Sequence, residues 1–369
     1  MELNEPYRRL WPETDADEWA IFAVTGGRAP NLLPVGHRRA LAEALVRHHA
    51  AMDTKERLVR NAAWAAARLG LLTPVLRKRI SVPRSYGDGP SLHEELEHLL
   101  GVAPLELAVA FGPPRPNQKP VVRAIDRRGR TVAFAKVGWN DLTARLVEQE
   151  ASTLSRPAMR SLRHVMVPDV IAVEEWAGFR LAVYAPLLGR PGRSAPTWQA
   201  FHEVARLWPT TRQPLADAPV TAWLRVWPAS EEAEKAAEVL SEALDRWGGV
   251  EVEVGGWHGD WTPWNTARHS HDRWIVWDWE RSEGGVPTLF DLIHYRFQPR
   301  AVRSEYPAEE LIEDLSTQTP LGRDLSPTAL SAVVAWYLLA ISRRHAGHAG
   351  LSQLGQVRRL LESRVGARS

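Results

Sequence analysis

The sequence predicts an α+β protein with strands in the middle of the chain and helices in its C-terminal part. Two observations support this class. Short apolar runs bounded by turn-forming residues favour strands at 105–111, 121–126, 131–137, 170–174 and 179–184. Later segments have helical signals, at 197–207, 230–247, 291–297, 307–315, 326–341 and 351–365. Ser230 is the predicted N-cap of one of these helices, and Ser326 with Pro327 opens another.

The composition limits the classes of function. A chain of 369 residues, 44% of them hydrophobic, can bury a large core and form two or three domains or lobes. The net charge of +2 is too small to favour a nucleic acid, so we expect no nucleic-acid partner. The absence of cysteine excludes disulfides, thiolate metal sites and cysteine nucleophiles.

The two features that would suggest export or a membrane span are missing. The chain starts Met-Glu-Leu-Asn-Glu-Pro, without the basic start and apolar stretch of a signal peptide, so we expect a cytoplasmic protein. The longest apolar run, 329–341, is shorter than the roughly 20 residues that a spanning helix needs. We therefore expect a buried helix there and no transmembrane segment.

Residues 1–100 are predicted to form a mainly helical, basic extension, with helices at 37–51 and 54–70. Between residues 38 and 79 there are ten Lys or Arg against three acidic residues. Such a basic amphipathic segment can contact an anionic membrane surface. The simpler interpretation, which we prefer, is a solvated arginine-rich face packed on the rest of the protein.

A lysine and a glutamate in the middle of the chain are predicted to pair. Lys136 ends the strand-like run 131–137, and a helix follows at 142–155. Glu150 lies on the apolar face of this helix, with leucines four residues before and after it. An unpaired carboxylate is costly to bury, so Lys136 is its natural partner. Glu148 lies on another face and is the weaker candidate.

The segment with the most candidate catalytic and metal-binding residues begins at His258 and ends at Glu280. Asp260 is followed five residues later by Asn265, a spacing that can place a carboxylate beside an attacking hydroxyl and an amide oxygen near a metal ion. Asp278 follows an apolar strand-like run and can bind Mg²⁺ from a rigid support. Two acids and an amide with these separate tasks favour phosphoryl transfer.

The order His-x-Asp-x-x-x-x-Asn, then hydrophobic-Asp, resembles the catalytic and metal-binding loops of the aminoglycoside phosphotransferase and choline kinase group. The segment 285–292 is similar to the Gly-x-Pro-x-x-x-Asp-Leu continuation of that group. Asp278-Trp279-Glu280 stands where protein kinases have Asp-Phe-Gly, which favours the small-molecule branch. The resemblance implies a two-lobed protein-kinase-like fold, with an antiparallel-sheet N-lobe at 101–187 and a mainly helical C-lobe at 188–369.

The resemblance also implies roles for residues of the catalytic and metal-binding loops. Asp260 would be the catalytic base, supported by His258, which orders the loop. Asp291 would be a structural carboxylate that holds the loop in place. Asn265 and Asp278 would bind Mg²⁺, and Glu280 would be either a second metal contact or a solvated surface acid.

Other residues are implied to bind the nucleotide. Lys136, fixed by Glu150, would hold phosphates. The backbone of a hinge segment would meet the adenine, and its candidate residues are Tyr184, Ala185 and Leu187. The connection 112–120 has one glycine and four prolines instead of a glycine-rich phosphate loop, so Arg115 or Lys119 can supply charge there.

The implied reaction transfers the γ-phosphoryl group of ATP, with GTP possible, to a hydroxyl of a small molecule. An antibiotic, a sugar or an amino alcohol would fit, and the 17 tryptophans weakly favour a sugar or a cation. Three alternatives stay open. The protein can be a regulatory pseudokinase without turnover, a protein kinase, which the missing motifs disfavour, or a surface-binding protein acting through its basic N-terminal region.

Overall fold

The computed structural model describes most of the chain, and the described residues fall into two compact units. The first comprises residues 1–159 and 167–191, and the second residues 160–166 and 192–369. Each unit is described by itself. The described residues are 17–22, 31–46, 54–74, 76, 79–82, 85–86, 89–111, 116–189, 195–230, 232–270, 272–302, 305–320, 324–346 and 353–363.

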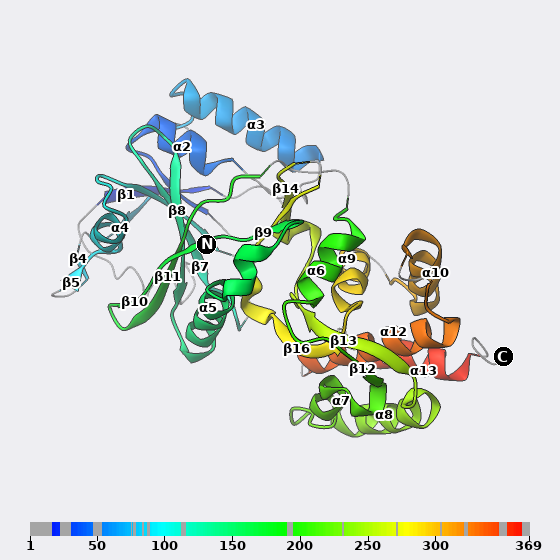
Figure 1. Ribbon diagram of the computed structural model, residues 1–369. Helices are drawn as coiled ribbons and strands as arrows, with labels where there is room; N and C mark the ends of the chain where they lie inside the picture. Colours follow the sequence, from blue (N-terminus) through cyan, green and yellow to red (C-terminus); the bar gives the residue numbers. More distant parts are fainter. Residues whose placement is uncertain are drawn as a thin grey trace. The chain divides into compact units, whose positions relative to one another are not determined.

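An eight-stranded antiparallel sheet is the centre of the first unit (Figure 1). All five strand-like runs predicted between residues 105 and 184 are strands of this sheet. Its order is β10-β11-β8-β7-β6-β2-β1-β3. The strands are β1 Asp17–Phe22, β2 Asn31–Pro34, β3 Arg79–Val82, β6 Glu106–Phe111, β7 Pro120–Ile125, β8 Thr131–Gly138, β10 Val170–Trp176 and β11 Phe179–Tyr184.

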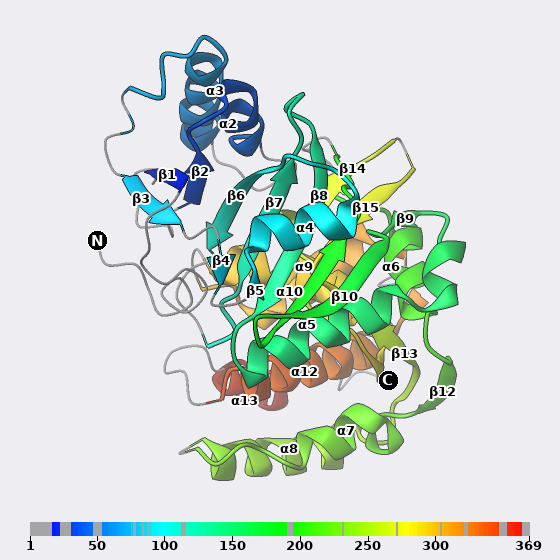
Figure 2. The ribbon, with the colours of Figure 1, turned by 90° about the vertical axis from the view of Figure 1, so that its left-hand side faces the viewer.

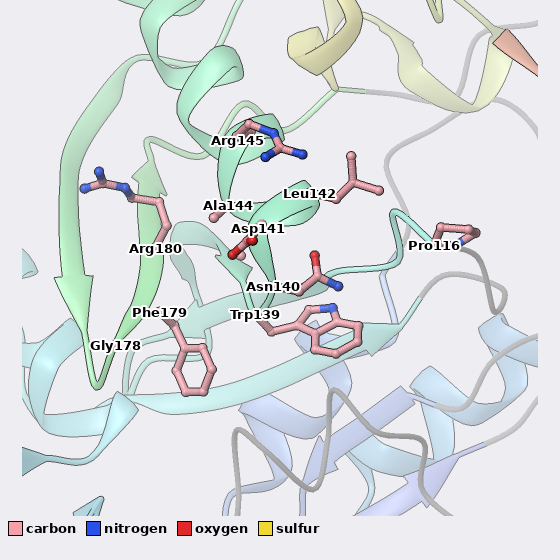
Figure 3. Close-up of a pocket in the computed structure, with 11 residues that line it drawn as sticks. Pro116, Trp139, Asn140, Asp141, Leu142, Ala144, Arg145, Gly178, Phe179 and Arg180 are labelled. Carbon is pink, nitrogen blue, oxygen red and sulfur yellow. The ribbon is translucent and has the colours of Figure 1, made fainter. Parts of the chain in front are cut away.

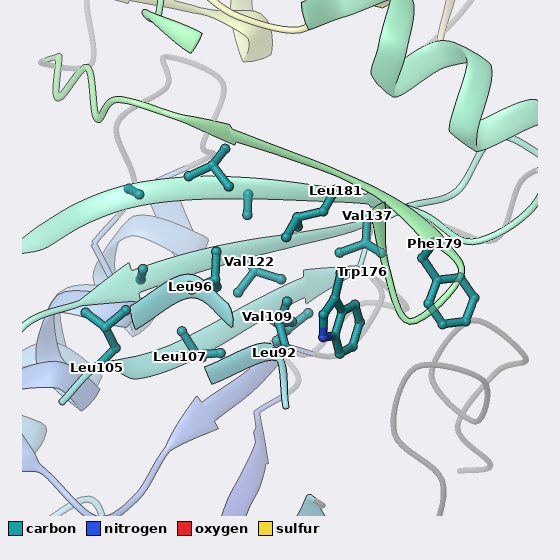
Figure 4. Packing of buried hydrophobic residues seen from close by; sticks show 14 of the residues in the cluster. Leu92, Leu96, Leu105, Leu107, Val109, Val122, Val137, Trp176, Phe179 and Leu181 are labelled. Carbon is teal, nitrogen blue, oxygen red and sulfur yellow. The ribbon is translucent and has the colours of Figure 1, made fainter. Parts of the chain in front are cut away.

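The two faces of strand β8 have different neighbours. Ala133, Ala135 and Val137 belong to an apolar core that also contains Leu92 and Leu96 of helix α4 (Leu92–Leu100), as Figure 4 shows in part. Side chains alternate along a strand, so Lys136 points to the opposite face. Helix α4 begins with a capping box between Ser91 and Glu94.

Helix α5 (Asp141–Leu154) follows β8 after a very short connection. Asn140 caps it by accepting a hydrogen bond from the N–H of Thr143 at 2.9 Å. A Cβ at Gly138 would lie 2.5 Å from the Cα of Ala144, so only glycine permits this approach of strand and helix. The connection thereby fixes where the polar side chains of α5 meet the sheet.

The N-terminal region differs from the predicted mainly helical extension. Helices α2 (Arg38–Ala44) and α3 (Thr54–Arg68) lie within the two predicted helical stretches. However, β1, β2 and β3 continue the sheet beyond β6, and β4 (Ser85–Tyr86) and β5 (Gly89–Pro90) form a small hairpin. These strands have two to six residues each, too short for a periodic signal, and it is pairing that makes them strands.

Arg123 joins α2 to the sheet. Its Nη1 donates to the carbonyl oxygen of Glu43 at 2.6 Å, and its Nη2 to that of Val46 at 3.0 Å. These carbonyls lie at the end of α2, where backbone acceptors lack helical partners. Burial lowers the pKa of Arg123 to about 10, so the guanidinium stays charged at neutral pH. Strands β1 to β3 and helix α2 are therefore part of the same fold as the central sheet.

The second unit is mainly helical and contains two small three-stranded sheets, β12-β13-β16 and β14-β15-β9. Helix α13 lies beside α12 (Figure 2). The helices are α6 Trp198–Ala205, α7 Pro219–Leu224, α8 Ala233–Trp247, α9 Phe290–Ala301, α10 Ala308–Gln318, α12 Pro327–Arg344 and α13 Leu354–Glu362. The strands are β9 Val165–Met166, β12 Thr211–Pro214, β13 Glu251–Trp257, β14 Thr266–Arg268, β15 Trp274–Val276 and β16 Glu283–Pro287.

Helix α12 is buried on all sides from Ala329 to Ser342, which confirms the predicted buried helix. Its predicted start is also confirmed, because Ser326 Oγ accepts a hydrogen bond from the N–H of Ala329 at 3.1 Å. The prediction for Ser230 was wrong. Helix α8 has Glu232 as its N-cap without a side-chain cap, and the Ser230 carbonyl accepts the N–H of Ala233 instead.

These elements confirm the predicted fold class. An antiparallel sheet with a helix after its lysine-bearing strand forms the first unit, and helices around a strand-loop-strand segment form the second. The lobe boundary at 187 and 188 stays a prediction. Within the described part of the chain, no helix has both the length and the apolar character needed to span a bilayer.

Candidate active site

The predicted lysine–glutamate pair is present in the first unit. Lys136 Nζ lies 2.7 Å from both Oε1 and Oε2 of Glu150, and both side chains are buried. The hydroxyl of Tyr184 also donates to Glu150 Oε2, at 3.4 Å. Burying two charges is costly unless their geometry is good, and here both carboxylate oxygens contact the ammonium group. Glu148, the weaker candidate, is exposed and contacts Arg180 at 3.3 Å.

The three hinge candidates have different surroundings. The side chain of Tyr184 is buried against the lysine–glutamate pair, with Lys136 Nζ 5.9 Å from its ring centre. The N–H of Ala185 donates to the carbonyl oxygen of Asp169 at 2.8 Å, so this N–H is already used within the fold. Leu187 is half-buried. An adenine contact through the Ala185 N–H is therefore excluded.

The predicted phosphate-covering connection is only partly described. Arg115 lies outside the described residues, whereas Lys119 is half-buried. Near this connection a pocket of about 800 Å³ opens beside the start of α5 (Figure 3). No residue that the sequence predicted as functional lines it. Its lining includes Pro116, Trp139, Asn140, Arg145, Phe179 and Arg180.

In the second unit, Asp260 and Asn265 are hydrogen-bonded to each other. They lie in the loop between β13 and β14, and Asn265 ends a short 3₁₀ turn, Pro263–Asn265. Asn265 Nδ2 donates to the carbonyl oxygen of Asp260 at 2.9 Å and to its Oδ2 at 3.1 Å. The amide nitrogen is thus directed at Asp260, and the amide oxygen is the atom that can face a cation.

Backbone hydrogen bonds connect this loop to the segment before Asp278. The N–H of Trp277 donates to the carbonyl oxygen of Asn265 at 3.0 Å, extending the pairing of β14 with β15. The carbonyl oxygen of Trp277 is 2.8 Å from His258 Nε2. Asp278 itself has φ +63°, a left-handed conformation that a non-glycine residue adopts at a cost. Asp278, whose backbone conformation is strained, therefore directly follows Trp277, whose backbone is held by two hydrogen bonds.

His258 is buried and neutral. Burial lowers its pKa to about 4, despite the nearby carboxylates of Asp260 and Asp278. Its Nδ1 accepts a hydrogen bond from the N–H of Asp260 at 3.2 Å, so the proton is on Nε2, which donates to Trp277. The ring therefore bridges the loop and the strand that precedes Asp278. This geometry is what the proposed supporting role requires.

Asp291, in the first turn of α9, lies under the loop. Its Oδ2 accepts the N–H of His258 at 2.6 Å, and its Oδ1 accepts the N–H of Gly259 at 3.2 Å. Burial raises the pKa of Asp291 to about 7, against the opposing effect of these two bonds. Arg344, from the end of α12, donates to the carbonyl oxygen of Gly259. Both backbone polar groups of Gly259 are therefore satisfied from neighbouring helices.

Glu280 lies in a short 3₁₀ turn, Trp279–Arg281, directly after Asp278. The structure contradicts one of its two predicted roles, because only 7% of the residue is exposed and it is no solvated surface acid. Glu280 comes shortly after a buried apolar strand and directly after the buried Trp279, so its side chain lies in the interior. Its role as a second metal contact stays a prediction.

Sequence reasoning missed three residues around Asp260. His294 Nε2 lies 3.3 Å from Asp260 Oδ1, and His294 Nδ1 lies 2.9 Å from the hydroxyl of Tyr337. Arg344 was missed as well. His294 follows Asp291 by three residues and so shares its helix face, which is a weak signal. No sequence pattern connects Tyr337 or Arg344 to the loop.

The ionisation of Asp260 reflects these neighbours. Burial raises the pKa of its carboxyl group, but the hydrogen bond from His294 and the other nearby donors and charges, Arg281 among them, together lower it more. The net result is a pKa below the usual value. Asp260 is therefore ionised at neutral pH and can accept a hydrogen bond.

The donor set near Asp278 fits magnesium. Among the described residues, no cluster of three His, Cys, Asp or Glu side chains could hold a metal by itself. Mg²⁺ rarely uses such a cluster, because it prefers one or two carboxylates, water and the phosphate oxygens of a substrate. The carboxylate of Asp278 and the amide oxygen of Asn265 are oxygen donors of the type that Mg²⁺ prefers.

Comparisons with known proteins find similarity in structure only. No family model matches the chain, and no curated protein matches it in sequence. A thermostable mutant of aminoglycoside phosphotransferase APH(4)-Ia, in complex with ADP and hygromycin B, is 15% identical, with 75% of this chain and 99% of that chain covered and a TM-score of 0.45. A putative fructosamine-3-kinase from Haemophilus somnus is 12% identical, with 73% and 95% covered and a TM-score of 0.42. At these values the similarity carries no argument about activity.

Gly259 permits the close approach of the loop to Arg281. It has φ +84°, and a Cβ there would lie 2.3 Å from the carbonyl oxygen of Arg281. We expect Gly259→Ala to lower the free energy of unfolding by about 2 kcal/mol or more, measured by urea denaturation. Gly249→Ala is the matched control, because a Cβ there meets nothing within 4 Å. Equal stability of the two variants would contradict the proposed packing of the loop.

The neutral state of His258 predicts a dependence of stability on pH. The folded-state pKa of about 4 lies below the usual 6.5, so the unfolded chain binds one more proton between these values. The free energy of unfolding should therefore fall as the pH falls from 6.5 to 4, by about 3 kcal/mol from this group. Urea denaturation at several pH values measures the slope. His258→Gln should have a smaller slope, and an unchanged slope would show that His258 is not the group responsible.

Proposed function

We propose that this protein transfers the γ-phosphoryl group of ATP or GTP to a hydroxyl of a small molecule. One observation carries the proposal. Asp260 and Asn265 are hydrogen-bonded to each other, and the backbone of Trp277, the residue before Asp278, bonds to Asn265 directly and to Asp260 through His258. A base and two metal ligands with fixed relative positions are the arrangement that this reaction requires.

Asp260 is the proposed base. Its Oδ1 and Oδ2 are each in contact with a donor, His294 and Asn265, and 36% of its side chain is exposed. The carboxylate is thus held in place yet still accessible to an acceptor. Because its pKa is lowered, it is ionised at neutral pH, so it can orient the acceptor hydroxyl and take its proton.

Asn265 and Asp278 are the proposed ligands of Mg²⁺. When bound, the ion would supply positive charge to offset the negative charge that develops on the transferred phosphoryl group. The fold's contribution is to fix the two ligands. Asn265 is held through its side-chain bonds to Asp260 and its carbonyl bond to Trp277, and Asp278 follows Trp277 directly. Two further residues hold the same loop in place. His258 does so through a ring nitrogen, and Asp291 through its carboxylate.

Lys136 is proposed to bind nucleotide phosphates, and Glu150 to hold it in position. The pair is buried and close, so the ammonium group has a defined place in the first unit. The segment 184–187 is the proposed site for the purine, with the Ala185 N–H excluded as a donor. The acceptor is a small molecule with a hydroxyl group. An antibiotic, a sugar or an amino alcohol would each fit the proposal.

Nucleotide binding can be tested by thermal unfolding with ATP or GTP, with and without Mg²⁺. At about 100 times the dissociation constant, binding should add roughly 2.7 kcal/mol of stability. Asp278→Ala and Asp278→Gly should both lose the Mg²⁺-dependent part. Because φ at this position is +63°, the glycine variant should be more stable than the alanine variant by about 1 kcal/mol without ligand.

The two Asp278 variants separate the lost carboxylate from the backbone strain. Loss of the Mg²⁺-dependent shift in both would assign the effect to the carboxylate. A retained shift in both would place the metal elsewhere, and no shift with either nucleotide in the unmodified protein would reject the nucleotide site. A shift without turnover of any acceptor would favour the alternative of a nucleotide-binding regulatory protein.

Catalysis can be tested with Asp260→Asn and a panel of hydroxyl acceptors. The asparagine keeps the size of the side chain but cannot accept the proton. We expect kcat to fall by about 10² to 10³ or more, while the thermal shift with Mg²⁺ and nucleotide is kept. Glu148→Gln, an exposed substitution outside the site, is the control and should not change kcat. Retained turnover in Asp260→Asn would remove Asp260 from the role of base.

A further inference from the structure

A buried chain of hydrogen bonds runs from helix α12 to Asp260. The hydroxyl of Tyr337 lies 2.9 Å from Nδ1 of His294, and Nε2 of His294 lies 3.3 Å from Oδ1 of Asp260. Tyr337 is fully buried, and His294 is 3% exposed. We propose that His294, held by Tyr337, is the positioning residue that fixes the orientation of the Asp260 carboxylate. The proposal rests on the proposed function, since it takes Asp260 as the base.

The direction of the hydrogen bonds follows from the chemistry of the groups. Burial holds the pKa of Tyr337 well above its usual value, so the phenol keeps its proton. The ionised carboxylate of Asp260 can only accept a hydrogen bond from Nε2 of His294, so Nδ1 is left to accept one from the Tyr337 hydroxyl. Burial also lowers the pKa of His294, against the effect of Asp260, so the ring is neutral. A neutral imidazole that accepts at Nδ1 carries its hydrogen on Nε2. His294 therefore donates to Asp260.

Tyr337 is itself well held. Its ring meets Phe290 and Phe297 edge-on, with ring centres 5.7 Å apart in both cases. Helix α12 is buried on all sides around it. A phenol confined in this way has few rotamers, so its hydroxyl gives His294 a fixed partner. The ring nitrogen that donates to Asp260 is thereby fixed as well.

The consequence for Asp260 is that both carboxylate oxygens are fixed from different elements. Asn265 contacts Oδ2 from the loop itself, and His294 contacts Oδ1 from α9. Without His294, the carboxylate could rotate about its Cβ–Cγ bond while keeping one bond. Catalysis by positioning depends on such restriction, because small displacements of a base lower the rate strongly. A role in packing alone would leave the rate per folded molecule unchanged.

The test compares His294→Leu, His294→Gln and Tyr337→Phe in the full chain, with an acceptor found in the screen above. His294→Leu should lower kcat about 10- to 100-fold with the KM for nucleotide within about twofold. His294→Gln should restore most of kcat, because its amide can donate from a similar place. The double variant His294→Leu with Tyr337→Phe should be no slower than His294→Leu, since Tyr337 acts through His294.

A second readout needs no activity. In protein labelled with ¹⁵N-histidine, two-bond ¹H–¹⁵N spectra distinguish the two neutral forms of each ring, and the His294 signals are those missing from His294→Gln. We expect the form protonated at Nε2, and a mixture of both forms in Tyr337→Phe. Melting temperatures of all variants show how much stability each substitution removes.

Three results would overturn the proposal. These are an unchanged kcat in His294→Leu, an equal loss of kcat in His294→Gln and His294→Leu, or a His294 ring protonated at Nδ1. Failure of the proposed function gives a different pattern, in which Asp260→Asn keeps its turnover or the unmodified protein has none. The positioning role then falls with the base, while the spectra still decide whether Tyr337, His294 and Asp260 are joined as described.

Discussion

The candidate site depends on the carboxylate of Asp291, which accepts the N–H groups of both His258 and Gly259. A loop that enters the interior brings backbone polar groups with it, and each must find a partner or cost free energy. Asp291 satisfies two of them at once, and Arg344 satisfies the carbonyl of Gly259. With the backbone fixed in this way, the side chains of His258 and Asp260 have defined directions.

Helix α12 connects the stability of the second unit to the precision of the site. Its interior residues are apolar and buried on all sides, so the helix can hardly move without opening the core. Two of its residues reach the loop, Tyr337 through His294 and Arg344 directly. The pKa of Arg344 is lowered by burial to about 10, which leaves it charged at neutral pH. The packing of α12 in the core therefore also determines the position of the loop.

The sequence predicted the features that have strong local signals. The pairing of Lys136 with Glu150 followed from a charge on an apolar helix face, and the start of α12 from a serine before a proline. It did not predict β1 to β3, which are strands only because they pair with the edge of the sheet. Nor did it predict that Tyr337 reaches Asp260 through His294, since helix periodicity shows that a residue is buried but not what it contacts. Glu280 was uncertain for the same reason.

The left-handed backbone of Asp278 has a consequence for how this chain can change over generations. At φ +63° glycine is the residue with the least strain, so an aspartate there opposes the preference of the backbone itself. Selection for stability alone would favour its replacement, whereas selection for metal binding would oppose it. A descendant that no longer needed the reaction could replace this aspartate with glycine and relieve the backbone strain. The identity of the residue at position 278 would then indicate whether the proposed metal binding is still under selection.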